Sequence, residues 1–163
     1  MKKNILDNQN DNKNQNKIDF DAEGKIYHYY INKHKEFSQK YGPKTLILMM
    51  VGSFYEMYAV FDQGPDLLEV SKLLNIICTR KNKVLQESWE NPKMMGFQMN
   101  SLEKFLEILT NNNYTVIVYD QKVTIKKLAS EQKEKRTITR EITGIYTKGI
   151  NINNLQQYNN NYL

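Results

Sequence analysis

Hydrophobic positions in the first half of the chain follow two different spacings. Over residues 24–41 aromatic and apolar side chains recur every three or four positions, which predicts an amphipathic helix that ends at Gly42-Pro43. Residues 45–51 form a continuous apolar run, the pattern of a strand covered on both faces. The Gly-Ser pair that follows predicts a turn into a second short strand over 54–58.

The second half continues this interleaving of helices and strands. The pattern predicts helices over 67–74 and 102–109, and strands over 75–80, 94–97, 114–119 and 137–145. Pro65 is expected at the first position of the earlier helix, and Asn100 with Glu103 has the spacing of a capping pair for the later one. The fold class is therefore α/β, bordering on α+β, with a mixed central β-sheet and about three flanking helices.

Both ends of the chain are rich in asparagine and poor in apolar residues. We expect disordered tails over 1–19 and 151–163 and one folded domain over 20–150. The longest apolar run is far shorter than the ~20 residues of a membrane-spanning helix, and no secretory signal is recognisable. A single cysteine, Cys78, rules out a disulfide framework and fits a reducing intracellular compartment, such as cytoplasm or nucleus, rather than secretion.

Positive charge is concentrated in one segment. The formal net charge is +5, and residues 122–140 alone carry seven Lys or Arg against two Glu. We interpret this segment as a basic loop. A localised basic surface favours nucleic acid or an acidic membrane as partner, although a merely solvated loop has the same composition.

Residue patterns for catalysis or metal binding are missing from the sequence. Gly144 and Gly149 have the spacing of a phosphate-binding loop, but Ile150 and Asn151 follow where lysine and a hydroxyl are required. The two histidines and the cysteine lack partners at metal-ligand or nucleophile spacing. We therefore expect no enzyme activity, no metal site and no cofactor in this chain.

The most distinctive segment is the second strand, which reads Phe54-Tyr55-Glu56-Met57. Alternate side chains of a strand share a face, so Phe54 and Glu56 lie on one side and Tyr55 on the other. If Tyr55 and Met57 point inward, an exposed phenylalanine stands beside a carboxylate. The opposite arrangement buries Phe54 and leaves Glu56 at the rim of the sheet, and residue pattern alone allows both.

Several motifs in order resemble the amino-terminal mismatch-recognition domain of the MutS family of DNA mismatch repair proteins. Residues 52–58 resemble its Gly-Asp-Phe-Tyr-Glu motif, 76–80 its Thr-x-Arg strand, and 92–97 its Pro-Met-Ala-Gly segment. Ser53 replaces the usual Asp and Met95 the usual Ala, and the proline of the family's Thr-Pro-Gly-Thr is missing near 147–149. Family members are longer and carry connector, clamp and ATPase domains, for which these 163 residues have no counterpart.

The resemblance implies binding of double-stranded DNA with a mismatched or unpaired base. In this interpretation Phe54 wedges against the mispaired base and Glu56 hydrogen-bonds to it, where unstacking is least costly. Supporting phosphate contacts would come from six cations: Arg80, Lys81, Lys83, Lys126, Lys127 and Arg136. ATP and magnesium would be needed only if a partner chain supplies the ATPase and the remaining MutS-type domains.

Two other interpretations stay open at this stage. The chain is then either a truncated MutS remnant without a repair role, or a protein-interaction module whose basic segment binds an acidic partner. An exposed Phe54 favours DNA, whereas a buried Phe54 favours the interaction module.

Overall fold

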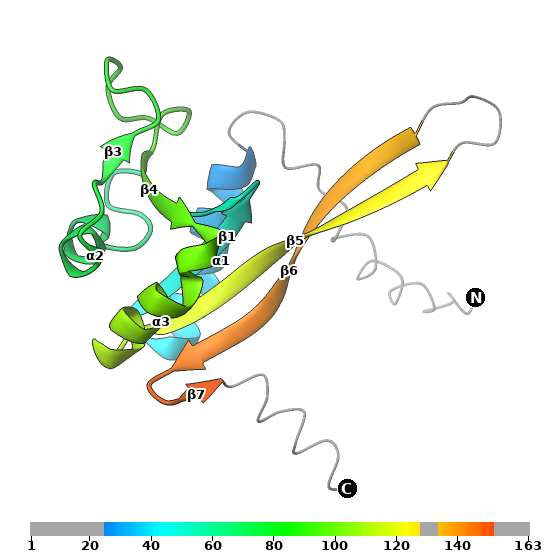
Figure 1. Cartoon of the computed structure of the whole chain (residues 1–163). Coiled ribbons are helices and arrows are strands. Elements are labelled where there is room, and N and C mark those ends of the chain that lie inside the picture. The colour runs from blue at the N-terminus through cyan, green and yellow to red at the C-terminus, as the bar shows by residue number, and fades with distance from the viewer. Residues whose placement is uncertain (1–24, 128–133, 152–163) are drawn as a thin grey trace, which may run out of the picture.

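Strand β1 (Thr45–Val51) lies in the middle of a seven-stranded mixed sheet in the computed structural model, which describes residues 25–127 and 134–151 (Figure 1). The strand order is β3-β4-β2-β1-β5-β6-β7. Only the β1–β5 pairing is parallel, and the other five are antiparallel. The other strands are β2 (Phe54–Ala59), β3 (Thr79–Arg80), β4 (Lys93–Gln98), β5 (Thr115–Lys127), β6 (Glu134–Thr147) and β7 (Ile150–Asn151).

Helix α1 (Lys25–Tyr41) covers one face of the central strands. Its aromatic stripe packs on the sheet, and the Tyr30 hydroxyl donates to the Ile47 carbonyl at 2.7 Å. Helix α3 (Leu102–Asn111) covers the opposite face, where Phe105 packs on Phe97 of β4 with ring centroids 4.5 Å apart. Helix α2 (Leu67–Leu74) contacts α3, β4 and β2. The mixed sheet with three helices confirms the predicted fold class.

Three local predictions were wrong. Only Thr79–Arg80 of the predicted strand 75–80 pairs with β4, because Asn75 is the left-handed C-cap of α2 and Ser71 Oγ donates to the Ile76 carbonyl. Asn100 does not cap α3: it lies inside a 3-10 turn, Met99–Ser101, that runs into the helix. Pro65 precedes the N-cap of α2, where Asp66 Oδ1 accepts from the Glu69 N–H at 3.2 Å.

The largest difference concerns the predicted basic loop, because residues 122–127 and 134–140 are strands. Most of them belong to a long hairpin, because β5 continues to Lys127 and β6 begins at Glu134 (Figure 1). Alternating threonine, valine and isoleucine between the lysines supply the β-branched side chains that favour pairing. The paired strands β5 and β6, which we call the β5–β6 ribbon, extend beyond Tyr119 past the end of β1. The predicted tails lie outside the described residues, apart from Asn151 in β7.

Candidate nucleic-acid interface

The hairpin that joins β1 to β2 is a tight two-residue turn. Val51 pairs with Phe54, and the turn residue Gly52 has φ +60°. A positive φ at the first turn position strongly favours glycine, which explains why Gly precedes the Phe-Tyr-Glu segment. The Met99 N–H donates to the Ser53 carbonyl at 2.9 Å, so the end of β4 braces the turn.

Phe54 is exposed and Tyr55 is buried. Phe54 has 42% of its surface accessible, Glu56 is half-buried, and Tyr55 and Met57 point into the core. The structure therefore has the first of the two arrangements that the sequence allowed, with an exposed phenylalanine beside a carboxylate. Strand alternation places both on the face that α1 covers further along the strand, where Tyr58 contacts α1.

Tyr55 fixes the strand from the opposite face. Its ring packs on Phe97 at 5.9 Å, and its hydroxyl donates to Asp120 Oδ1 on β5. Burial and the Asp120 carboxylate raise the pKa of Tyr55, so the hydroxyl remains a donor at neutral pH. Phe54 and Glu56 therefore project from a strand whose other side is anchored in the core.

Glu56 has two close neighbours that sequence reasoning missed. The Tyr58 hydroxyl donates to Glu56 Oε2, and Gly96 faces Glu56 across the β2–β4 pair. A Cβ at Gly96 would lie 3.3 Å from Glu56 Cγ and 2.8 Å from the Tyr55 carbonyl oxygen. Only the register of β4 on β2 relates Gly96 to Glu56, and residue pattern does not specify that register.

The three predicted cations before β4, Arg80, Lys81 and Lys83, have different surroundings. Lys81 Nζ lies 5.6 Å from the ring centroid of Tyr27, and Tyr27 packs edge-on against Tyr58 at 4.9 Å. Lys81 thus belongs to the face of Phe54 and Glu56. Arg80 donates to the Lys83 carbonyl at 2.8 Å. Arg80 pairs with Lys93 of β4, and Lys93 pairs with Ala59 of β2. Ala59 lies five residues from Phe54, or about 17 Å along the strand.

The β5–β6 ribbon carries the other predicted cations on two opposite faces. The pairs Lys126–Lys135, Ile125–Arg136 and Lys127–Glu134 place Lys127 and Arg136 on one side and Lys126 on the other. Strand pairing relates the Lys127 side, through Tyr119 and Met49, to the side of the sheet that carries Phe54. All three cations are exposed, but they do not form one continuous surface.

Arg140 was not among the predicted site residues. It pairs with Gln121, where the ribbon leaves the central sheet. Its Nε donates to the Met50 carbonyl at 2.8 Å, which joins β6 to the end of β1 beside the turn. A bulge near Val118 and Tyr119 lets the Thr143 hydroxyl donate to Asp120 Oδ2 at 2.6 Å. The ribbon is therefore braced against the hairpin that presents Phe54.

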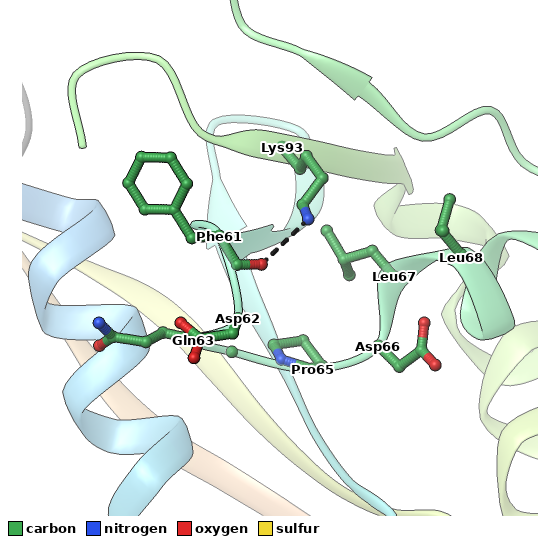
Figure 2. A pocket seen from close by; sticks show the side chains of 9 residues that line it. Phe61, Asp62, Gln63, Pro65, Asp66, Leu67, Leu68 and Lys93 are labelled. Atoms are coloured by element: carbon green, nitrogen blue, oxygen red, sulfur yellow. Dashed lines mark hydrogen bonds between the residues drawn. The ribbon is translucent and has the colours of Figure 1, made fainter. Parts of the chain in front are cut away.

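A second exposed phenylalanine lies beyond the other end of β2. Phe61 lines a cavity with Leu68 and Lys93, and Lys93 Nζ donates to the Phe61 carbonyl at 3.2 Å (Figure 2). The Phe61 N–H donates to Glu87 Oε1 at 2.5 Å, and Lys93 pairs with the same carboxylate at 3.5 Å. Asp62 and Asp66 also line this cavity. Sequence reasoning had not identified this site.

The isolated histidines and the cysteine have ordinary structural surroundings. His28 stacks on Trp89 at 4.4 Å, and His34 Nε2 lies 3.0 Å from the Thr45 carbonyl. Cys78 is half-buried, and burial raises the pKa of its thiol. Within residues 25–127 and 134–151, no group of three or more His, Cys, Asp or Glu could hold a metal ion. No helix in the same part of the chain is long and apolar enough to cross a membrane.

The fold and the site define a small α/β domain whose central hairpin displays a Phe-x-Glu pair beside a basic ribbon. The sequence pattern of the family described as MutS domain I matches residues 12–154, so the chain belongs to this family. It is 33% identical over 141 residues to a DNA mismatch repair protein mutS homolog of Acanthamoeba polyphaga mimivirus, covering 85% of this chain and 12% of that protein. It is 35% identical over 135 residues to the DNA mismatch repair protein MutS of Chlorobium phaeobacteroides, covering 82% and 14%.

The DNA mismatch repair protein MutS of Borreliella burgdorferi is also similar, with 32% identity over 135 residues. The match covers 82% of this chain and 13% of that protein. The chain therefore spans about one eighth of the length of these relatives, and the match to the family concerns domain I alone. The resemblance noted from the Phe-Tyr-Glu segment is confirmed at the level of the family.

Proposed function

We propose that this chain binds double-stranded DNA and recognises mismatched or unpaired bases in DNA mismatch repair. The observation that carries the proposal is the exposed Phe54 ring beside Glu56, on a strand anchored through Tyr55. Phe54 stacks on the mispaired base from the minor groove, and Glu56 hydrogen-bonds to the displaced base edge. Unstacking costs a few kcal/mol at a paired step and less at a mismatch, so deformability supplies the preference.

Phosphate contacts supply the sequence-independent part of the affinity. Lys81 lies on the face of Phe54, and Lys127 and Arg136 share one side of the ribbon. Arg80, Lys83 and Lys126 are proposed as weaker contributors, because the Arg80 guanidinium is already bonded to the Lys83 carbonyl and Lys126 points from the opposite side of the ribbon. Each phosphate neutralised makes binding more sensitive to salt.

Partner, cofactor and location follow from the same proposal. DNA is the primary partner, and a chain that carries the remaining MutS-type domains is the second. This domain turns over no ATP of its own, and any ATP-dependent step belongs to the ATPase in that partner. An intracellular compartment that contains DNA is the place where such a domain acts. No membrane contact is part of this function.

The experiment is a titration of labelled duplexes that differ at one position, either perfectly paired, mismatched, or carrying one unpaired base. We expect tighter binding to the two imperfect duplexes and an affinity that falls steeply with salt. Equal affinity for all three would refute mismatch recognition and favour the truncated remnant. Binding that does not change with salt would exclude phosphate contacts and favour the protein-interaction module.

The two sides of the ribbon provide an internal control. Lys127→Ala and Arg136→Ala should weaken binding to every duplex about equally, because phosphate contacts carry no sequence information. Lys126→Ala removes the same charge from the neighbouring position and should have the smaller effect. Equal losses from Lys126→Ala and Lys127→Ala would show that the ribbon does not present one side to DNA.

A further inference from the structure

The Glu56 carboxylate is held by a residue outside the Phe-x-Glu pair. Tyr58, two residues further along the same strand, donates its hydroxyl to Glu56 Oε2. Gly96 lies opposite Glu56 on β4, and a Cβ there would crowd Glu56 Cγ at 3.3 Å. Glu56 is therefore held at its tip by Tyr58 and passes over a strand position that has no side chain.

Tyr58 is itself fixed by the core. It is 2% exposed, and its ring contacts Tyr27 and Tyr30 of α1 edge-on, with centroids 4.9 and 5.3 Å away. Tyr30 is in turn bonded to the Ile47 carbonyl of β1. Burial raises the pKa of Tyr58 and the Glu56 carboxylate raises it further, so the hydroxyl keeps its proton and remains a donor.

We infer that Tyr58 is a positioning residue for mismatch recognition, which holds Glu56 in the orientation that meets the displaced base. This inference rests on the proposed function. A glutamate on a surface strand samples several rotamers, and binding must select one of them at an entropic cost. With Oε2 engaged by Tyr58, the carboxylate is oriented before DNA arrives, and Oε1 is the oxygen left for the base.

The first test is Tyr58→Phe, which removes one hydroxyl and keeps the ring that packs on α1. We expect the preference for a mismatched over a paired duplex to fall about three- to tenfold, the effect of releasing one or two side-chain rotations. Affinity for the paired duplex should stay within about twofold, because no phosphate contact is lost. A merely structural role would weaken binding to both duplexes and lower the melting temperature instead.

Tyr114→Phe is the matched control. Tyr114 is also a buried tyrosine whose hydroxyl is hydrogen-bonded to a glutamate, Glu69, but it directly precedes β5 at the end of the sheet where β1 starts, away from Phe54. We expect the mismatch preference to survive in this variant. An equal loss of preference in Tyr114→Phe and Tyr58→Phe, or no loss in Tyr58→Phe, would overturn the inference.

A second readout needs no DNA. Three-bond NMR couplings report whether the Glu56 side chain occupies one rotamer, as we expect for the native protein, or several, as we expect for Tyr58→Phe. Averaged couplings in the native protein would overturn the inference. Couplings that are fixed in the native protein and averaged in Tyr58→Phe, without any mismatch preference, would refute the proposed function alone and would still confirm that Tyr58 holds Glu56.

Discussion

One exposed phenylalanine begins strand β2 and another lies two residues beyond its end, and the chain holds them in different ways. Phe54 is 42% exposed and Phe61 is 57% exposed. Phe54 is the first residue of β2, and its backbone is part of the β1–β2–β4 ladder. Phe61 lies in a turn with φ +52°, a conformation that is unusual for a bulky residue. Glu87 and Lys93 bind its backbone N–H and carbonyl.

Exposure of an aromatic ring alone therefore does not define a DNA wedge in this molecule. Phe54 has Glu56 on the same face of the sheet. Lys81 lies over the ring of Tyr27, which packs on Tyr58 on that face. Phe61 lies in a turn outside the strand ladder, and Asp62, Asp66 and Lys93 line the cavity beside it (Figure 2), so no strand pairs its ring with a carboxylate on one face. The comparison thus favours Phe54 over Phe61 as the proposed wedge.

The largest effect is expected from removing each ring in turn. Phe54→Ala should reduce the preference for a mismatched duplex about tenfold or more, because base–aromatic stacking contributes roughly 1–3 kcal/mol. Phe61→Ala should leave that preference intact. Fluorescence anisotropy with mismatched and paired duplexes measures both. Since Phe54 is exposed, its variant should keep its fold, which circular dichroism checks. Loss of preference in Phe61→Ala alone would reverse the assignment.

A smaller effect is expected from one cation on each face of the sheet. Lys81 lies over Tyr27 on the α1 face, and Lys104 lies over Phe105 on the α3 face at 5.4 Å. Lys81→Ala should lower the slope of log affinity against log salt by about one, the contribution of a single phosphate contact. Lys104→Ala should leave the slope unchanged. Equal slopes for the two variants would argue against DNA on the α1 face.

Stability provides a third contrast between the two phenylalanines. Asparagine tolerates a left-handed backbone better than phenylalanine, so Phe61→Asn should raise the free energy of unfolding by about 0.5 kcal/mol. Phe54→Asn places asparagine in a strand and should lower it. Urea denaturation of both variants measures the two signs. A destabilised Phe61→Asn would show that packing of the ring outweighs its backbone conformation.

The smallest effect is expected on the pH dependence of the free energy of unfolding. Burial lowers the pKa of His34, so the folded protein binds this proton less well than the unfolded chain, where the value is about 6.5. The free energy of unfolding should therefore fall as the pH drops below about 6.5. Urea titrations across this range test it, and His34→Gln should remove that part of the slope. An unchanged slope in His34→Gln would assign the pH dependence to other groups.

Periodicity was sufficient to predict most of the fold. The aromatic stripe of α1, the apolar run of β1 and the alternation in β2 are all local patterns, and each element formed as expected. The β5–β6 ribbon was misjudged, because lysines dominate its composition while Val123 and Ile125 carry the strand pattern. Pairing between β5 and β6 outweighs the low strand preference of lysine.

The site could be predicted in part. Alternation relates Phe54 to Glu56, but the exposure of Phe54 depends on how far α1 reaches over β2. That helix covers Tyr58 through Tyr27 and leaves Phe54 exposed, which is a tertiary property. Gly96 and Phe61 were missed because their roles depend on strand register and on one backbone angle. Neither quantity has a sequence signature.

The central claim is that Phe54 inserts beside the mispaired base, and fluorescence of 2-aminopurine tests it most directly. With the analogue placed next to a mismatch, binding of the native protein should change its emission, because the wedge alters the stacking of that base. Phe61→Ala should give the same change, and Phe54→Ala should abolish it at saturating protein. An undiminished change with Phe54→Ala would contradict the account.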